Sequence, residues 1–229
     1  MESIICKNCN GNQFDISGGR YVCKFCGTVF VDKEKSKTER LYLLARRAKD
    51  ENNAENAVKY YEMILPDDPL NWEPAFYSAY FKASDTTIKD IGSSAYTMSK
   101  SLDSIMMIVS TDNITDQEKE SIVIEVADKI MDLGEMMFSA ALDFYRDLDI
   151  YSKSSRRSDH IDRLSGVKTM LYQLGDSIEE WFGDNPMLMG KARTSWQMGV
   201  IVHKKFAFMT TDPETNHRII ELYDEKANG

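Results

Sequence analysis

The sequence lacks the segments that direct a protein into or across a membrane. Its longest run of apolar residues spans positions 105–109, whereas a membrane-spanning helix needs about 20 such residues. The first residues, MESII, contain neither the basic region nor the apolar stretch of a signal peptide. We therefore expect a cytoplasmic protein with no membrane partner.

Proline, glycine and positive charge are also scarce. Five prolines and twelve glycines in 229 residues exclude a fibrous or low-complexity chain. The 28 lysines and arginines are outnumbered by 37 acidic residues, and the net charge of −9 argues against a main role in binding bare nucleic acid. The nucleotide-binding and hydrolase motifs GxxxxGK[ST], GxGxxG and GxSxG are absent. A content of 42% hydrophobic residues is enough for a folded core. The length of 229 residues suits one large and one small folded domain.

Cysteine occurs only near the start of the chain, in two Cys-x-x-Cys pairs. The first pair is Cys6 and Cys9, and the second, Cys23 and Cys26, follows after thirteen residues. Two residues between cysteines let one tight turn present both sulfur atoms to the same ion, and Zn²⁺ prefers four such ligands in a tetrahedron. Paired thiols that stay reduced also suit the cytoplasm. The spacing predicts one metal site, while a redox Cys-x-x-Cys and a rubredoxin-like iron site remain open.

Short strand patterns rich in β-branched and aromatic residues surround the cysteines. They cover residues 13–16, 21–23 and 28–31. Two cysteine turns, a hairpin and a third strand resemble the zinc ribbons of transcription factors and of many bacterial proteins, over residues 1 to about 33. The resemblance implies that one Zn²⁺ is bound by Cys6, Cys9, Cys23 and Cys26. Four thiolates leave no position for water or substrate, so such a site is structural and not catalytic.

The predicted ribbon carries little excess charge. Residues 1–38 hold six basic and four acidic side chains, a net charge of +2, which leaves −11 for the rest of the chain. Lys7 and Lys24 lie beside the cysteines, where we expect them to offset the negative charge of a metal bound to four thiolates. Tyr21 and Phe25 could stack on a base, but no dense basic stripe accompanies them. We therefore expect a structural or protein-docking role for the ribbon rather than a nucleic-acid contact.

A helical hairpin is predicted after the ribbon. A charged linker spans residues 33–37, Thr38 caps the first helix, and residues 54–65 form the second. The hairpin resembles a tetratricopeptide repeat at Leu41, Leu44, Ala45, Ala48, Ala57, Tyr61, Ile64 and Pro69, the first four of which share one helix face. A second repeat begins at residues 72–80 and then loses the pattern. A peptide-binding groove and a plain hairpin packed on the C-terminal helices therefore remain equally open.

The rest of the chain carries helical patterns only. We expect a short helix over residues 85–92, capped by Asp85, and another over residues 93–110. Thr115 begins a capping box before an apolar stripe that runs to residue 148. Later helices are predicted over residues 158–182, from Pro186 and from Pro213. Long helices joined by short loops predict an antiparallel bundle.

Isolated polar features of this bundle are expected to be structural. His160, His203 and His217 lack the spacing of metal ligands or catalytic bases. The basic segment 152–158 is expected to be a solvated loop, although a phosphate or an acidic partner could bind there. Most of the thirteen methionines are expected to fill the core, with an adaptable binding surface as the alternative.

These patterns predict a mainly α protein with three parts. A small N-terminal zinc β-ribbon with four cysteine ligands covers residues 1–36, a tetratricopeptide-like hairpin and the start of a second repeat cover residues 38–83, and a helical bundle covers residues 84–229. A ribbon followed by tetratricopeptide-like helices resembles zinc-ribbon proteins of bacteria and phages. Stripes on both sides of the long helices suit a homo-oligomer as well as a monomer.

The expected function is that of a non-enzymatic adaptor or scaffold whose helical part binds another protein. The alternative is a transcription-associated or regulatory factor whose ribbon contacts nucleic acid or a polymerase. An enzyme would require carboxylates that converge between facing helices, which the sequence does not reveal.

Overall fold

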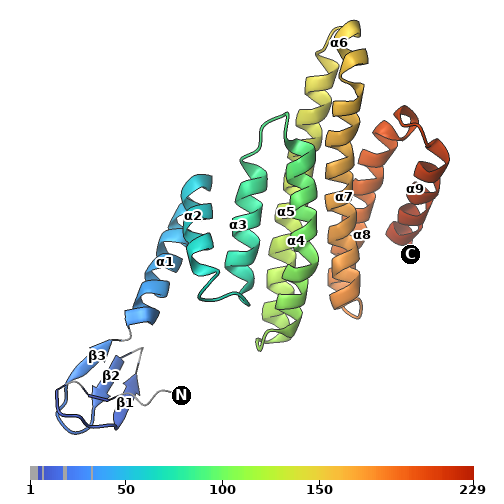
Figure 1. Ribbon diagram of the computed structural model, residues 1–229. Coiled ribbons are helices and arrows are strands. Elements are labelled where there is room, and N and C mark those ends of the chain that lie inside the picture. The colour runs from blue at the N-terminus through green and yellow to red at the C-terminus, as the bar shows by residue number, and fades with distance from the viewer. Residues whose placement is uncertain (1–4, 7, 18–19, 32) are drawn as a thin grey trace. The chain divides into compact units, whose positions relative to one another are not determined.

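The computed structural model describes residues 5–6, 8–17, 20–31 and 33–229, in two compact units (Figure 1). The first unit is Met1–Asp67 and the second is Asp68–Gly229. The described residues are mainly helical, with one small sheet near the N-terminus, which confirms the predicted fold class. Of the helices in these residues, none combines the length and apolar composition needed to cross a bilayer.

The first unit begins with a three-stranded antiparallel sheet. Its strands are β1 (Phe14–Ser17), β2 (Arg20–Cys23) and β3 (Val29–Val31), with β2 in the middle. The register pairs Phe14 with Cys23 and Tyr21 with Phe30. The three strands lie where the β-branched and aromatic runs predict them. The glycines of the predicted turn at residues 18–19 lie outside the described residues.

Two helices follow the sheet, α1 (Lys33–Asp50) and α2 (Ala54–Ile64). The predicted linker at residues 33–37 is wrong, because α1 already begins at Lys33; lysine and glutamate are good helix formers and continue the helix backwards. The small side chains of Ala45 and Ala57 are fully buried and let the two helices pack closely. Leu44, predicted to share the face of Leu41, is 42% exposed instead.

The second unit consists of helices around a buried central one. Its elements are α3 (Trp72–Ser84), α4 (Ile91–Thr111), α5 (Asp116–Arg146), α6 (Ile150–Ser155), α7 (Arg157–Phe182), α8 (Pro186–Phe206), η1 (Ala207–Met209) and α9 (Pro213–Asn228). Helix α7 packs against α4, α5 and α8, and α9 lies against α8 (Figure 1). Apolar side chains of α7 and α8 face this core, where Leu164, Leu171 and Trp196 are among the buried side chains.

Helix starts in the second unit follow their caps. Thr115 and Glu118 form both hydrogen bonds of the predicted capping box, and α5 runs unbroken through Gly134 to Arg146. Two expectations are wrong. Asp85 ends α3 and starts no helix, so α4 begins at Ile91. The segment 152–158 is not a loop, because Asp149 accepts hydrogen bonds from two backbone amides and starts α6.

Helices α4 and α7 approach so closely that glycine is required on both. A Cβ atom added to Gly166 of α7 would overlap the carbonyl oxygen of Gly92 in α4, and one added to Gly92 would lie 2.6 Å from the carbonyl oxygen of Asp162. Both obstacles are backbone atoms, which cannot rotate away as a side chain can. The crossing therefore sets the distance between the two helices.

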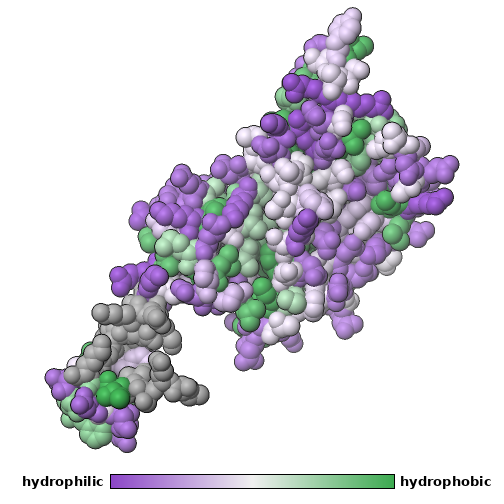
Figure 2. All heavy atoms as spheres, viewed as in Figure 1, coloured by the Kyte–Doolittle hydropathy of each residue, from purple (hydrophilic) through white to green (hydrophobic). Residues whose placement is uncertain are grey.

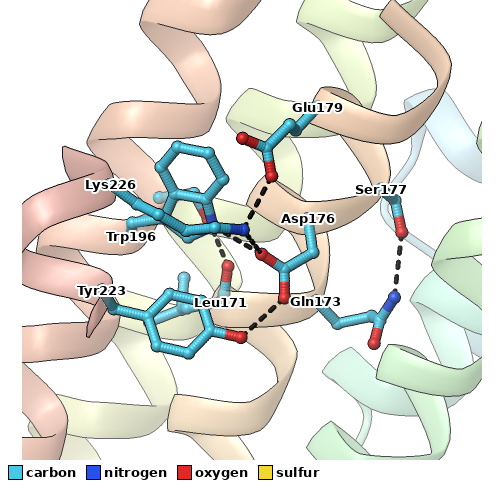
Figure 3. A network of polar contacts seen from close by, with 9 residues as sticks. Leu171, Gln173, Asp176, Ser177, Glu179, Trp196, Tyr223 and Lys226 are labelled. Atoms are coloured by element: carbon cyan, nitrogen blue, oxygen red, sulfur yellow. Dashed lines mark hydrogen bonds and ion pairs between the residues drawn. The ribbon is translucent and has the colours of Figure 1, made fainter. Parts of the chain in front are cut away.

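The C-terminal helix is held by a polar network centred on Asp176 of α7 (Figure 3). The carboxylate of Asp176 accepts hydrogen bonds from the Trp196 indole at 3.1 Å, the Tyr223 hydroxyl at 2.6 Å and the Lys226 ammonium at 2.8 Å. Lys226 also contacts Glu179 at 2.7 Å. Burial, followed by the bond to Asp176, raises the pKa of Tyr223, so its hydroxyl remains a donor. Every charge in this network is paired, and its role is to dock α9.

We predict that Gly166→Ala destabilises the protein, because the added methyl group forces two helix backbones apart. The free energy of unfolding should fall by about 3 kcal/mol, measured by urea denaturation. The matched control is Gly190→Ala in α8, where an added Cβ meets nothing within 4 Å. There, the greater helix preference of alanine should raise stability by about 0.5–1 kcal/mol. Equal effects of the two changes would contradict the close crossing.

Candidate metal centre

The four cysteines lie on two turns with the same backbone geometry. In the first turn, the Asn10 amide donates to the Cys6 carbonyl at 2.8 Å. In the second, the Gly27 amide donates to the Cys23 carbonyl at 2.9 Å. Asn10 has φ = 58° and Gly27 has φ = 69°, the left-handed region that asparagine and glycine tolerate best. The residue after each Cys-x-x-Cys therefore reverses the chain in the same way.

The two turns bring all four sulfur atoms together. The Sγ atoms of Cys6 and Cys26 are 3.6 Å apart, those of Cys9 and Cys23 are 3.5 Å apart, and all four lie within 4.8 Å of one another. A tetrahedral ion with metal–sulfur bonds near 2.3 Å requires sulfur–sulfur distances of about 3.8 Å. The arrangement fits that requirement, so the cluster could hold one metal ion. Cys6 and Cys23 are buried, whereas Cys9 and Cys26 face solvent.

Hydrogen bonds shift the pKa values of two of the cysteines, Cys26 and Cys9, in opposite directions. Those from the side chain and backbone of Thr28, whose hydroxyl is 3.1 Å from the Cys26 sulfur, lower the pKa of Cys26 to about 6. At Cys9 the Gly11 amide favours the thiolate, but the contacts with the Cys26 sulfur and the other neighbouring sulfurs outweigh it and raise the pKa to about 12. The Cys26 sulfur is therefore a ready ligand, whereas the Cys9 sulfur needs a cation nearby before it ionises.

Several side chains around the cluster were not identified from the sequence. Asn8 donates a hydrogen bond to the Thr28 hydroxyl at 3.1 Å and so supports the contact of Thr28 with Cys26. A Cβ atom on Gly11 would overlap the Phe25 ring. The sequence does contain a sign of the two equivalent turns, because the pattern Cys-Lys-x-Cys followed by asparagine or glycine occurs twice.

The charged and aromatic residues of the ribbon are placed differently from the expectation. The Lys24 ammonium lies 3.0 Å from the Asp15 carboxylate on β1, so that carboxylate, rather than the sulfur cluster, is its ion-pair partner. Lys7 lies outside the described residues. The Tyr21 ring packs edge-on against Phe14, while the Phe25 side chain is 64% exposed. Of the two aromatic residues predicted to be able to stack on a base, Phe25 is thus the more accessible.

The cysteine cluster is the one group of metal-ligating side chains found in the described part of the chain. The three histidines stay apart: His160 stacks on Tyr145, His203 bonds to Asn216, and His217 pairs with Glu221. Carboxylates from α5 and α7, including Glu120 and Glu179, do border a cavity of about 700 Å³. Glu120 accepts a hydrogen bond from Asn185, and Glu179 pairs with Lys226. These carboxylates are therefore engaged in structural contacts.

Comparison of the chain with models of known protein families, with curated proteins and with solved structures finds no match.

We predict that Gly27→Ala weakens metal binding, because alanine is strained by about 1–2 kcal/mol in the left-handed region. A competition titration of Zn²⁺ against a coloured chelator should show about a tenfold loss of affinity. Asn10→Gly at the equivalent position of the other turn is the control and should bind at least as tightly as the wild type. Unchanged affinity in Gly27→Ala would show that the turn geometry does not matter for the site.

Proposed function

We propose that the N-terminal sheet is a zinc ribbon with one structural Zn²⁺, and that the protein is a non-enzymatic adaptor whose helices bind another protein. The observation that carries the first part is the cluster of four sulfur atoms at near-tetrahedral spacing. Four thiolates fill the coordination sphere of zinc, so the ion would hold the two turns together and take no part in a reaction.

The size of the sheet supports a structural role for the metal. Its strands have four, four and three residues. Such a small element cannot be stabilised by apolar burial alone. A bound Zn²⁺ would supply on the order of 10 kcal/mol to its folding.

The pairing of the sulfurs favours a metal over a redox role. In a redox Cys-x-x-Cys, the two cysteines of one motif form a disulfide with each other. Here the contacts of 3.5 and 3.6 Å each join a cysteine of one turn to a cysteine of the other. Four sulfurs shared across two turns are the arrangement of a tetrathiolate metal site, which zinc fits and which iron also fits.

We predict about one Zn per chain in the purified protein, measured by inductively coupled plasma mass spectrometry. Cys23→Ser should lose the metal, because a serine oxygen does not replace a buried thiolate ligand. The control is Asn12→Ser, an exposed change in the same segment, which should retain full metal content. Full occupancy of Cys23→Ser would contradict the four-ligand site, and a visible absorption band with bound iron would contradict the choice of zinc.

Exposed apolar side chains on the first unit support a protein partner. On the hairpin of α1 and α2, which we propose is of the tetratricopeptide type, Leu43 is 68% exposed and Met63 is 46% exposed. Figure 2 shows apolar side chains among hydrophilic ones on the visible face of this hairpin. Exposed apolar side chains suit contact with another protein better than contact with a polyanion. The surplus of acidic residues points in the same direction.

We predict that the full-length protein retains a stoichiometric partner protein in affinity purification from a nuclease-treated native lysate. The double change Leu43→Ser and Met63→Ser should release this partner, and Glu55→Ser on α2 is the exposed control that should keep it. Recovery only of nuclease-sensitive material, or of RNA polymerase, would instead support the regulatory factor. A purification without any partner would contradict the adaptor.

A further inference from the structure

The second unit contains a cavity of about 580 Å³ that the proposed function does not use. It lies where the turn between α3 and α4 meets the first turn of α4, Phe144 of α5 and the first residues of α7. In Figure 1 this is the end of the unit from which α6 extends. The volume is within the range of about 300–1,000 Å³ that is usual for small-molecule sites.

A buried arginine without an ion-pair partner lines this cavity. Arg163 of α7 is only 4% exposed. Its Nε donates to the Ile88 carbonyl at 2.6 Å, and its guanidinium lies 5.1 Å from the centre of the Phe144 ring. Its Nη1 is buried and has no hydrogen-bond partner among the described residues. Taking a cation out of water is costly unless an anion compensates it, so this side chain points to a ligand.

The neighbouring His160 holds a second buried nitrogen without a hydrogen-bond partner. His160 lies three residues before Arg163 and stacks on Tyr145 with ring centres 3.9 Å apart. Burial, and then the charge of Arg163, lower the pKa of His160. Its Nδ1 is the second buried side-chain nitrogen without a partner, and these two atoms are the only such cases in the described chain. Both lie on the same stretch of α7.

The first turn of α4 contributes a second attractive element. Gly92 and Ser93 line the cavity, and α4 is a helix of 21 residues. Asp90, at its N-cap position, makes no side-chain capping bond and instead accepts a hydrogen bond from the Thr87 hydroxyl at 2.7 Å. The amides of the first turn therefore have no side-chain cap. Free amides at a helix N-terminus and the helix dipole favour an anion.

Of the charged residues that line the cavity, three are basic and two are acidic. Lys89 and Arg156 line it together with Arg163, against Asp159 and Asp162. The two aspartates are exposed to solvent, whereas Arg163 is buried. Asp159 lies in the first turn of α7, where a carboxylate interacts favourably with that helix. The only one of these three charged side chains that is buried away from water is therefore the positively charged Arg163.

We propose that this cavity binds the phosphate group of a small phosphorylated molecule. The guanidinium of Arg163 and the amides at the start of α4 are the donors that hold phosphate oxygens in proteins. Ile88 and Phe144 provide an apolar wall for the organic part of the ligand. The site is independent of the cysteine cluster and of the proposed adaptor role, so either can fail without the other.

The test is a titration of the full-length, metal-loaded protein with inorganic phosphate in a chloride buffer, followed by thermal stability and by the ³¹P line width. The wild type should saturate, with a melting temperature that rises with phosphate concentration. Lys89→Gln and Arg156→Gln, both at exposed positions, should each weaken binding about fivefold or more, and Arg163→Gln should abolish it. The control Arg218→Gln on α9, which removes an exposed charge elsewhere, should bind as the wild type does.

Two outcomes would overturn the proposal. One is the absence of saturation up to about 10 mM phosphate, which corresponds to an affinity too weak for a built site. The other is equal weakening in Arg218→Gln and Arg156→Gln, which would mean nonspecific attraction to surface charge. Because Lys89 and Arg156 lie on the surface, the test remains decisive even where Arg163→Gln fails to fold.

Discussion

The backbone contact between α4 and α7 is the constraint on which the second unit depends. Gly92 and Gly166 allow the two helices to approach until a carbonyl oxygen occupies the space of a side chain. The contact fixes the position of α7, which in turn packs on α5 and α8. One turn before the crossing, the same approach places Arg163 within reach of the Ile88 carbonyl and beside the first turn of α4. The candidate phosphate cavity is therefore a consequence of how the core is packed.

The first unit follows a different logic, because Cys6 and Cys23 are the only buried residues among the side chains that the structure describes before α1. Order comes from two equivalent turns, each closed by a hydrogen bond to its first cysteine and reversed by a residue with positive φ. These turns present their four sulfurs to a common centre, where the ligand atoms lie within 4.8 Å of one another. Negative charge on several sulfurs at once is unfavourable without a cation, and the cluster could hold a metal ion that supplies this positive charge.

Much of this arrangement could be predicted from local sequence. The cysteine spacing, the capping box at Thr115 and the apolar stripes of α5, α7 and α8 each depend on residues close together in the chain. Two features that the sequence did not reveal are decided by a single cap or by distant groups. Helix α6 depends on Asp149, and the buried state of Arg163 depends on α4 and α5, which cover it. From the sequence alone, that arginine resembles an ordinary charged residue on the exposed face of a helix.

The polar contacts that dock α9 have a consequence for the order in which the second unit unfolds. Only Ile220 and Ala227 of this helix are buried, whereas Tyr223 and Lys226 bind the Asp176 carboxylate. Polar contacts of partly exposed groups are weakened by salt far more than an apolar core is. Opening of α9 would precede global unfolding. The backbone amides of α9 would then exchange their hydrogens earlier than those of the core, as a separate cooperative segment does. It would uncover Trp196, whose ring centre now lies 4.6 Å from the Lys226 ammonium, and so change the fluorescence of that tryptophan.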